Sequence, residues 1–103
     1  MVQVTWTEPA LADLEDIRRH IARAAPGIAD AFVDRLVDAS ARLEALPLSG
    51  RTVPEVGRNE IREVISLGYR LIYSVLAHEV EVLAVIHGAR LLSPEDLSVG
   101  FVQ

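Results

Sequence analysis

Arginines are the residues of this sequence with the clearest chemical potential. Arg62 and Arg70 fall in two neighbouring strand-like runs, and Arg90 follows a third such run by three residues. Guanidinium groups that lie close together on one sheet face can grip a phosphate or a carboxylate through paired hydrogen bonds. Alternatively, each arginine forms a separate, exposed ion pair that contributes little to stability. The acidic residues available for such pairs include Glu60, Glu63 and Glu81.

Histidines and paired carboxylates give weaker signals. His20, His78 and His87 are too far apart in the sequence to form a local ligand pair, and no cysteine supplements them. We therefore expect no metal site and no cofactor. Glu79 and Glu81 could act as paired carboxylates, but two charges that begin a strand after a turn are typical of a solvated edge. Neither a Ser-His-Asp arrangement nor a glycine-rich phosphate loop can be assembled with any specificity.

The composition excludes several kinds of chemistry. All ten basic residues are arginine, so a catalytic lysine is ruled out, and the absence of cysteine rules out disulfides, thiolate zinc sites and cysteine nucleophiles. With 15 acidic residues the net charge is −5 and the isoelectric point is about 5.1. This balance argues against binding nucleic acid by overall charge, and we expect no direct, sequence-specific binding of nucleic acid.

The chain has the length and hydropathy of one globular domain. Its 103 residues allow a single core, which we expect to span about residues 2–92, followed by a C-terminal tail, residues 93–103. The N-terminus lacks the basic and long apolar regions of a signal peptide, and no stretch approaches the ~20 apolar residues of a membrane span. We therefore expect a cytoplasmic protein with no membrane partner.

The first half of the chain predicts a short strand and a helical hairpin. Apolar and polar residues alternate over residues 2–7, and Thr7 is then placed to cap a helix whose apolar stripe ends near Ala24. Pro26 and Gly27 break the pattern, so a second helix follows almost at once and packs antiparallel to the first.

The apolar stripe of the second helix is wider than one neighbour requires. It runs from Ile28 to Leu46, with Val33 and Val37 beside it. We expect this helix to be wedged between the first helix and the sheet; the alternative is an exposed surface for a partner.

The second half predicts a meander of three strands after an irregular loop. Two prolines and two glycines break residues 47–59, and strand-like runs follow at 61–67, 69–77 and 80–87. Because their connections are tight, these strands must be antiparallel. The result is an α+β fold of order β-α-α-β-β-β, with the helical hairpin on one face of an antiparallel sheet and the opposite face left open. We place the first strand at one edge or beside the last strand.

Several motifs together resemble the ParE branch of the RelE/ParE toxin superfamily, over about residues 2–92. The matching stretches are Val4–Thr7 leading into Ala10, Asp13-Leu14 and Ile17; Pro47–Arg51; Arg62-Glu63; Gly68–Tyr73; and Val85–Arg90. The resemblance implies a type II toxin with a helical hairpin on a small sheet. Its partner would be a ParD-like antitoxin, with a DNA-binding N-terminal part and a C-terminal segment that wraps the toxin.

The resemblance implies two alternative activities. ParE members inhibit DNA gyrase, whereas RelE members cut messenger RNA on the ribosome with basic side chains and, commonly, a tyrosine or histidine near the C-terminus. This sequence has no lysine, and no tyrosine or histidine after Arg90, so we expect a binding inhibitor that stabilises the cleaved-DNA complex of gyrase and is not an enzyme. If the chain is a ribonuclease, its catalytic residues would be His87, Arg62, Arg70 and Arg90. A third hypothesis is an interaction module that is no longer toxic.

Two binding surfaces are expected from these considerations. The antitoxin's C-terminal segment should fold across the helical hairpin and the open sheet face, because a labile partner suits folding coupled to binding. Its acidic side chains would face arginines, and the expected contacts are Arg62, Arg70, Tyr73 and Arg90. The segment after the last strand is the expected contact with the target, through Arg90, Leu91, Leu92 and Phe101.

Overall fold

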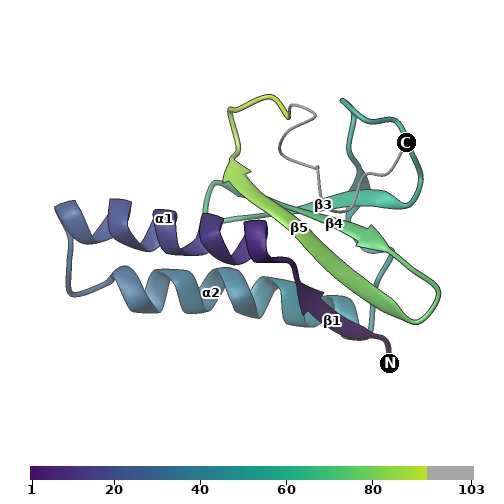
Figure 1. The fold of residues 1–103 in the computed structure, drawn as a ribbon, viewed down its shortest axis with the longest axis horizontal. Helices are drawn as coiled ribbons and strands as arrows, with labels where there is room; N and C mark the ends of the chain where they lie inside the picture. Colours follow the sequence, from purple (N-terminus) through teal and green to yellow (C-terminus); the bar gives the residue numbers. More distant parts are fainter. Residues whose placement is uncertain (93–103) are drawn as a thin grey trace.

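The computed structural model describes residues 1–92 and arranges them in two layers, a pair of helices and a sheet (Figure 1). The helices are α1 (Glu8–Ala24) and α2 (Ala29–Ala41), the latter followed by a 3₁₀ turn at Arg42–Glu44. The strands are β1 (Gln3–Trp6), β2 (Arg51–Thr52), β3 (Ile61–Ser66), β4 (Tyr69–Val75) and β5 (Glu79–His87). The predicted α+β fold and β-α-α-β-β-β order are confirmed, with the two-residue β2 as an addition.

Thr7 joins α1 to the sheet. Its hydroxyl accepts a hydrogen bond from the Ala10 N–H at 3.2 Å, as an N-cap does, and donates to the Leu83 carbonyl in β5 at 3.3 Å. The helix ends at Ala24, as predicted. The second helix packs on both α1 and β3, which is the arrangement expected of a wedged helix. Leu36 is fully buried there, whereas Val37 keeps 39% of its surface exposed.

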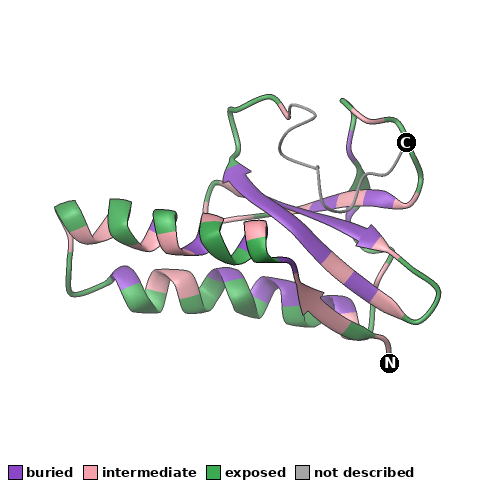
Figure 2. Ribbon diagram, in the orientation of Figure 1, coloured by how far each residue is buried: buried purple, intermediate pink, exposed green. Residues whose placement is uncertain are grey.

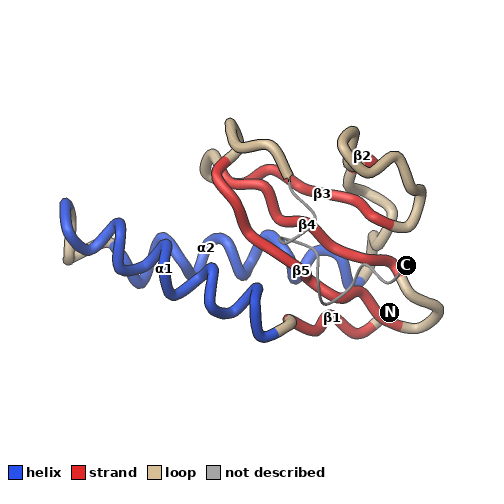
Figure 3. Tube along the Cα trace, turned by 45° about the horizontal axis from the view of Figure 1, so that its top comes forward, coloured by secondary structure: helices blue, strands red, loops and turns tan. Residues whose placement is uncertain are grey.

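The sheet is mixed, which corrects the expectation of an antiparallel sheet. Its strand order is β1-β5-β4-β3-β2, so β1 and β2 form opposite edges (Figure 3). Strands β3, β4 and β5 are an antiparallel meander, but β1 pairs in parallel with β5, from Gln3 opposite Glu79 to Trp6 opposite Val82. A parallel pair needs a long crossover, and the helical hairpin together with the meander supplies one.

The turn between β3 and β4 has two residues in the left-handed region. Leu67 has φ 53° and Gly68 has φ 82°, the conformation of the two-residue hairpin turn that matches strand twist. It places Ser66 opposite Tyr69, and this pairing sets the register of every residue in the β3–β4 ladder.

The sheet face away from the helices is covered, contrary to expectation. A buried cluster on this face is packed against Val56 and Leu92. Its members are Val53, Ile61, Ile72, Leu83, Ala84 and Ile86. The cover comes from residues 47–59, the segment predicted to be an irregular loop, which β2 attaches to β3. Figure 2 shows buried residues along β4 and β5.

Within residues 1–92, the helices are too short or too polar to cross a membrane. In the same part of the chain, no three histidine or carboxylate side chains are grouped so that they could hold a metal ion.

Candidate functional site

The register of the sheet separates Arg62 from Arg70. Arg62 lies opposite Tyr73, whereas Arg70 lies opposite Ile65. Because side chains alternate between faces along a strand, Arg62 and Ile65 belong to opposite faces, and Arg70 shares the face of Ile65. The two guanidinium groups therefore cannot bind the same anion together.

The guanidinium of Arg62 is bound to backbone at both ends of the 47–59 segment. Its Nη1 donates to the carbonyls of Gly50 at 2.8 Å and Leu48 at 3.3 Å. Its Nε donates to the Asn59 carbonyl at 3.0 Å, and its Nη2 to the Asn59 Oδ1 at 2.7 Å. Arg62 thus holds the segment as a closed loop against β3.

Tyr73 binds the same segment near its start, at Pro47 and Gly50. The side chain is fully buried, and its hydroxyl donates to the Pro47 carbonyl at 2.9 Å and accepts from the Gly50 N–H at 3.0 Å. Burial raises the pKa of the Tyr73 phenol, so the hydroxyl keeps the proton that it donates. Tyr73 was expected to contact the antitoxin, but in this conformation no part of it is accessible to a partner.

Arg70 is the centre of a buried ion-pair network. Only 4% of the residue is exposed, and its Nε lies 2.6 Å from Glu63 Oε1. Its two terminal nitrogens bind the Glu55 carboxylate at 2.7 and 2.9 Å, and Nη1 also donates to the Arg90 carbonyl at 2.9 Å. From the surface, Arg51 Nε reaches the other oxygen of Glu63 at 2.5 Å. Arg70 is therefore neither part of an open anion site nor an exposed ion pair.

The charges in this network stabilise one another. The hydrogen bonds from Arg70, and to a lesser extent the Leu92 N–H, hold the pKa of Glu55 at about 2, against the opposite effect of partial burial. Glu55 in turn raises the pKa of Arg70 above its ordinary value. Both groups remain charged at neutral pH, which suits a bidentate pair whose members are largely removed from water.

His87 lies on the other face of the sheet from Arg70. It is opposite Tyr69, whose ring contacts the His87 ring edge-on, with centroids 5.7 Å apart, and also contacts Phe32 in α2. The His87 Nδ1 accepts a hydrogen bond from the Ala89 N–H at 3.3 Å. His87, Arg62 and Arg70 are thus not brought together as a ribonuclease would need.

The expected target-binding residues differ in their exposure. Leu91 is 77% exposed, whereas Leu92 packs against the cluster on the face away from the helices. Arg90 is exposed, and its N–H donates to the His87 carbonyl at 2.9 Å. Phe101 lies outside the described residues.

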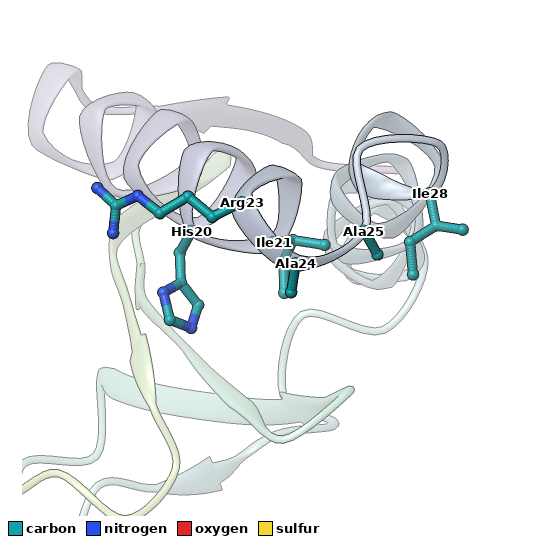
Figure 4. A pocket seen from close by; sticks show the side chains of 6 residues that line it. All are labelled: His20, Ile21, Arg23, Ala24, Ala25 and Ile28. Atoms are coloured by element: carbon teal, nitrogen blue, oxygen red, sulfur yellow. The ribbon is translucent and has the colours of Figure 1, made fainter.

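Hollows on the described surface include two that are large enough to accept a side chain of a partner. One, of about 440 Å³, lies between β2 and the residues that follow β5, with Arg51, Ile65 and Leu91 in its lining. The other, of about 400 Å³, lies at the closed end of the helical hairpin. Figure 4 shows its apolar floor of Ile21, Ala24 and Ala25 between His20 and Ile28.

Sequence reasoning missed Glu55, and it named Glu63 only as a partner in an exposed ion pair, whereas both complete the buried network. Glu63 could have been found, because it alternates with Ile61 and Ile65 on one strand face and a charge at such a position needs a partner. Glu55 carries no such signal, since it lies in an irregular segment.

Comparisons with known proteins agree with this architecture. A chain of a chromosomal ParDE toxin–antitoxin system from P. aeruginosa superposes with a TM-score of 0.73 at 22% identity, covering 84% of this chain and 96% of that one. A chain of the RelBE2 toxin–antitoxin complex from Mycobacterium tuberculosis gives 0.55 at 24% identity, covering 86% and 93%. Both likenesses concern the fold. No curated protein matches the chain.

The family comparison is the more specific of these findings. The model of the ParE toxin of the type II toxin–antitoxin system parDE matches residues 4–92. This range contains both helices, strands β2 to β5 and all of β1 except Gln3. With most of its 103 residues matched, the chain belongs to the ParE toxin family of type II toxin–antitoxin systems.

Proposed function

We propose that this toxin acts in the cytoplasm by binding DNA gyrase and stabilising its cleaved-DNA complex, with no chemistry of its own. The observation that supports this proposal is the placement of Arg62, Arg70 and His87. A ribonuclease that activates a ribose hydroxyl needs a proton acceptor, a proton donor and a cation around one phosphate. Here Arg62 and Arg70 are bound to protein groups, and His87 lies on the face of the sheet opposite Arg70.

The experiment compares the two activities directly. Purified toxin is assayed for inhibition of gyrase supercoiling and for accumulation of linear DNA after detergent treatment, beside a ribosome-dependent messenger RNA cleavage assay. We expect cleaved DNA and intact RNA, with both gyrase effects reversed by antitoxin. RNA cleavage without trapped DNA would replace this proposal with the ribonuclease, and antitoxin binding without either effect would indicate a module that is no longer toxic.

We further propose that a ParD-like antitoxin neutralises the toxin by covering the helical hairpin. The sheet face expected to receive it is already covered by residues 47–59 and Leu92. The hairpin, in contrast, exposes half or more of the surface of Leu11 and Ile28, and the hollow of about 400 Å³ lies beside Ile28. Burial of such apolar side chains favours association by roughly 25 cal/mol per Å².

A matched pair of substitutions tests this surface. Ile28 is the N-cap residue of α2, where aspartate is well tolerated, so Ile28→Asp should fold normally and weaken antitoxin binding at least about tenfold. Leu76→Asp places the same charge on an exposed leucine after β4, at the other end of the molecule, and should leave the dissociation constant unchanged. Equal effects of both substitutions would contradict an antitoxin surface on the hairpin.

A further inference from the structure

The residues that follow β5 are fixed to the sheet by contacts with three separate elements. We call residues Gly88–Leu92 the strap. The Gly88 N–H donates to the Gly68 carbonyl at 2.8 Å, in the turn between β3 and β4. Further along, the Arg90 carbonyl accepts from Arg70 Nη1 at 2.9 Å, and the Leu92 N–H donates to Glu55 Oε2 at 3.0 Å.

The last two contacts come from one ion pair and enclose the bond between Arg90 and Leu91. The Arg70 guanidinium binds the carbonyl of that peptide bond, and the Glu55 carboxylate binds the N–H of Leu92. Glu55 and Arg70 are also bound to each other through two hydrogen bonds, so movement of the strap at this point must break its hydrogen bonds to both members of a fixed pair. Leu91 lies between the two contacts, and 77% of its surface is exposed.

Arg70 and Glu55 differ in burial and in the other groups that they bind. Arg70 is bound on its inner side by Glu63, whose side chain is fully buried. The Glu55 side chain is 21% exposed and belongs to the covering segment rather than to the sheet. Removal of the Glu55 carboxylate therefore leaves the Arg70–Glu63 pair in place while it removes the contact between the covering segment and the strap.

We propose that Glu55 and Arg70 are positioning residues, which fix the direction of the chain after Arg90 and so present Leu91 to the target. The proposal rests on the proposed toxin function. The lowered pKa of Glu55 agrees with it, because the carboxylate then stays charged at any physiological pH. Neither residue needs to touch the target itself.

Trypsin offers a direct measurement, because it cleaves after arginine and the Arg90–Leu91 bond is the one held. Folded wild type, Glu55→Ala and the control Glu60→Ala are digested briefly, and release of residues 91–103 is followed by mass spectrometry. Glu60 binds Arg58 in an exposed ion pair, so its removal changes the charge equally without touching the strap. We expect cleavage after Arg90 to rise roughly tenfold in Glu55→Ala alone, which corresponds to about 1.4 kcal/mol of local opening. Cleavage after the exposed Arg23 should stay constant in all three proteins.

A functional readout distinguishes positioning from stability. Growth arrest on expression and the dissociation constant for the antitoxin are measured for the same three proteins. Glu55→Ala should lose at least about tenfold in potency of growth arrest while antitoxin affinity changes less than about twofold, whereas Glu60→Ala should change neither. Unchanged cleavage after Arg90, or raised cleavage with full potency, would overturn the proposal.

Growth arrest does not depend on the identity of the target, so the two proposals fail separately. If wild type arrests growth without inhibiting gyrase, the proposed target is wrong. The positioning role is then still supported when Glu55→Ala relieves the arrest, and overturned when it does not.

Discussion

The hydroxyl of Tyr73 lies 3.0 Å from the backbone nitrogen of Gly50, and this contact joins the centre of the sheet to the segment that covers its far face. The same oxygen donates to the Pro47 carbonyl, so one buried group satisfies two backbone groups of residues 47–59. The segment is also bound by Arg62, by the Glu55–Arg70 pair, and by Val53 and Val56 in the cluster on the far face. Its two-residue strand β2 pairs only with Glu63 and Arg62.

Replacing Tyr73 with phenylalanine should therefore destabilise the fold without removing a catalytic group. The substitution leaves the buried Gly50 N–H and the partly buried Pro47 carbonyl without their partner, which costs about 1–3 kcal/mol of unfolding free energy. Urea denaturation measures this loss. Tyr69→Phe is the control, since the Tyr69 ring packs on Phe32 and His87 at a partly exposed position. A Tyr73→Phe protein of full stability would show that the two hydrogen bonds contribute nothing.

Gly50 should tolerate no side chain. A Cβ at this position would overlap the Glu63 carbonyl oxygen and approach the Tyr73 hydroxyl to 2.6 Å, so Gly50→Ala should cost about 1–3 kcal/mol through displaced backbone. Gly27 is the matched control, because a Cβ there meets nothing within 4 Å. Gly27→Ala should be neutral, or stabilise by about 0.4–1 kcal/mol through the unfolded state. Equal midpoints of thermal unfolding for the two variants would refute this account.

Acid should weaken the network around Glu55. Its pKa is about 2 in the folded protein against an ordinary value of 4.5, so the unfolded chain binds more protons between these values. The contribution of this carboxylate is complete above about pH 4.5 and is lost as the pH falls toward 2. Chemical denaturation at steps from pH 6 to pH 2.5 should show Glu55→Gln losing about 1–3 kcal/mol less stability than wild type over that range. Parallel curves for the two proteins would mean that the pKa of Glu55 is not lowered.

His87 should be dispensable for toxicity. A proton-transfer residue typically supplies 10²- to 10⁴-fold of rate, so its loss would silence an enzyme, whereas a binding inhibitor tolerates most single losses. The His87 ring contacts only Tyr69 and the Ala89 N–H among the interactions described for it. We expect gyrase inhibition by His87→Ala within about threefold of wild type and no inhibition by a chain truncated after Ala89. A folded, antitoxin-binding His87→Ala protein without any toxicity would favour the ribonuclease.

The helices and the meander could be predicted because their signals are local. Thr7, the apolar stripe up to Ala24 and the break at Pro26-Gly27 each act within a few residues of the chain, and the structure agrees with them. The parallel pairing of β1 with β5 depends instead on how the whole crossover packs. No short-range pattern carries that information, so the mixed sheet was not foreseen.

The separation of Arg62 from Arg70 could have been derived from the sequence. If Leu67 and Gly68 form a two-residue turn, Ser66 faces Tyr69, and the pairing then places Arg62 opposite Tyr73. Tyr73 and Arg70 are three residues apart on β4, so their side chains lie on opposite faces of the sheet. Because Arg62 shares the face of Tyr73, the two arginines cannot share a face. The bonds of Arg70 to Glu55 and Arg90 were beyond such reasoning, because they depend on the path of two irregular segments.

The parallel pairing of β1 with β5 also sets the order in which the toxin can fold while it is being synthesised. Strand β1 and helix α1 are made first. Both pack against β5, which is not complete until His87. At roughly 5–20 residues per second, the ribosome takes on the order of several seconds to cover that interval. During this time the apolar stripe of α1 has no sheet to cover, and the nascent chain is open to chaperones, proteases and an antitoxin that is already present. The complete fold, with β1 paired to β5, therefore forms only after the last strand has been made.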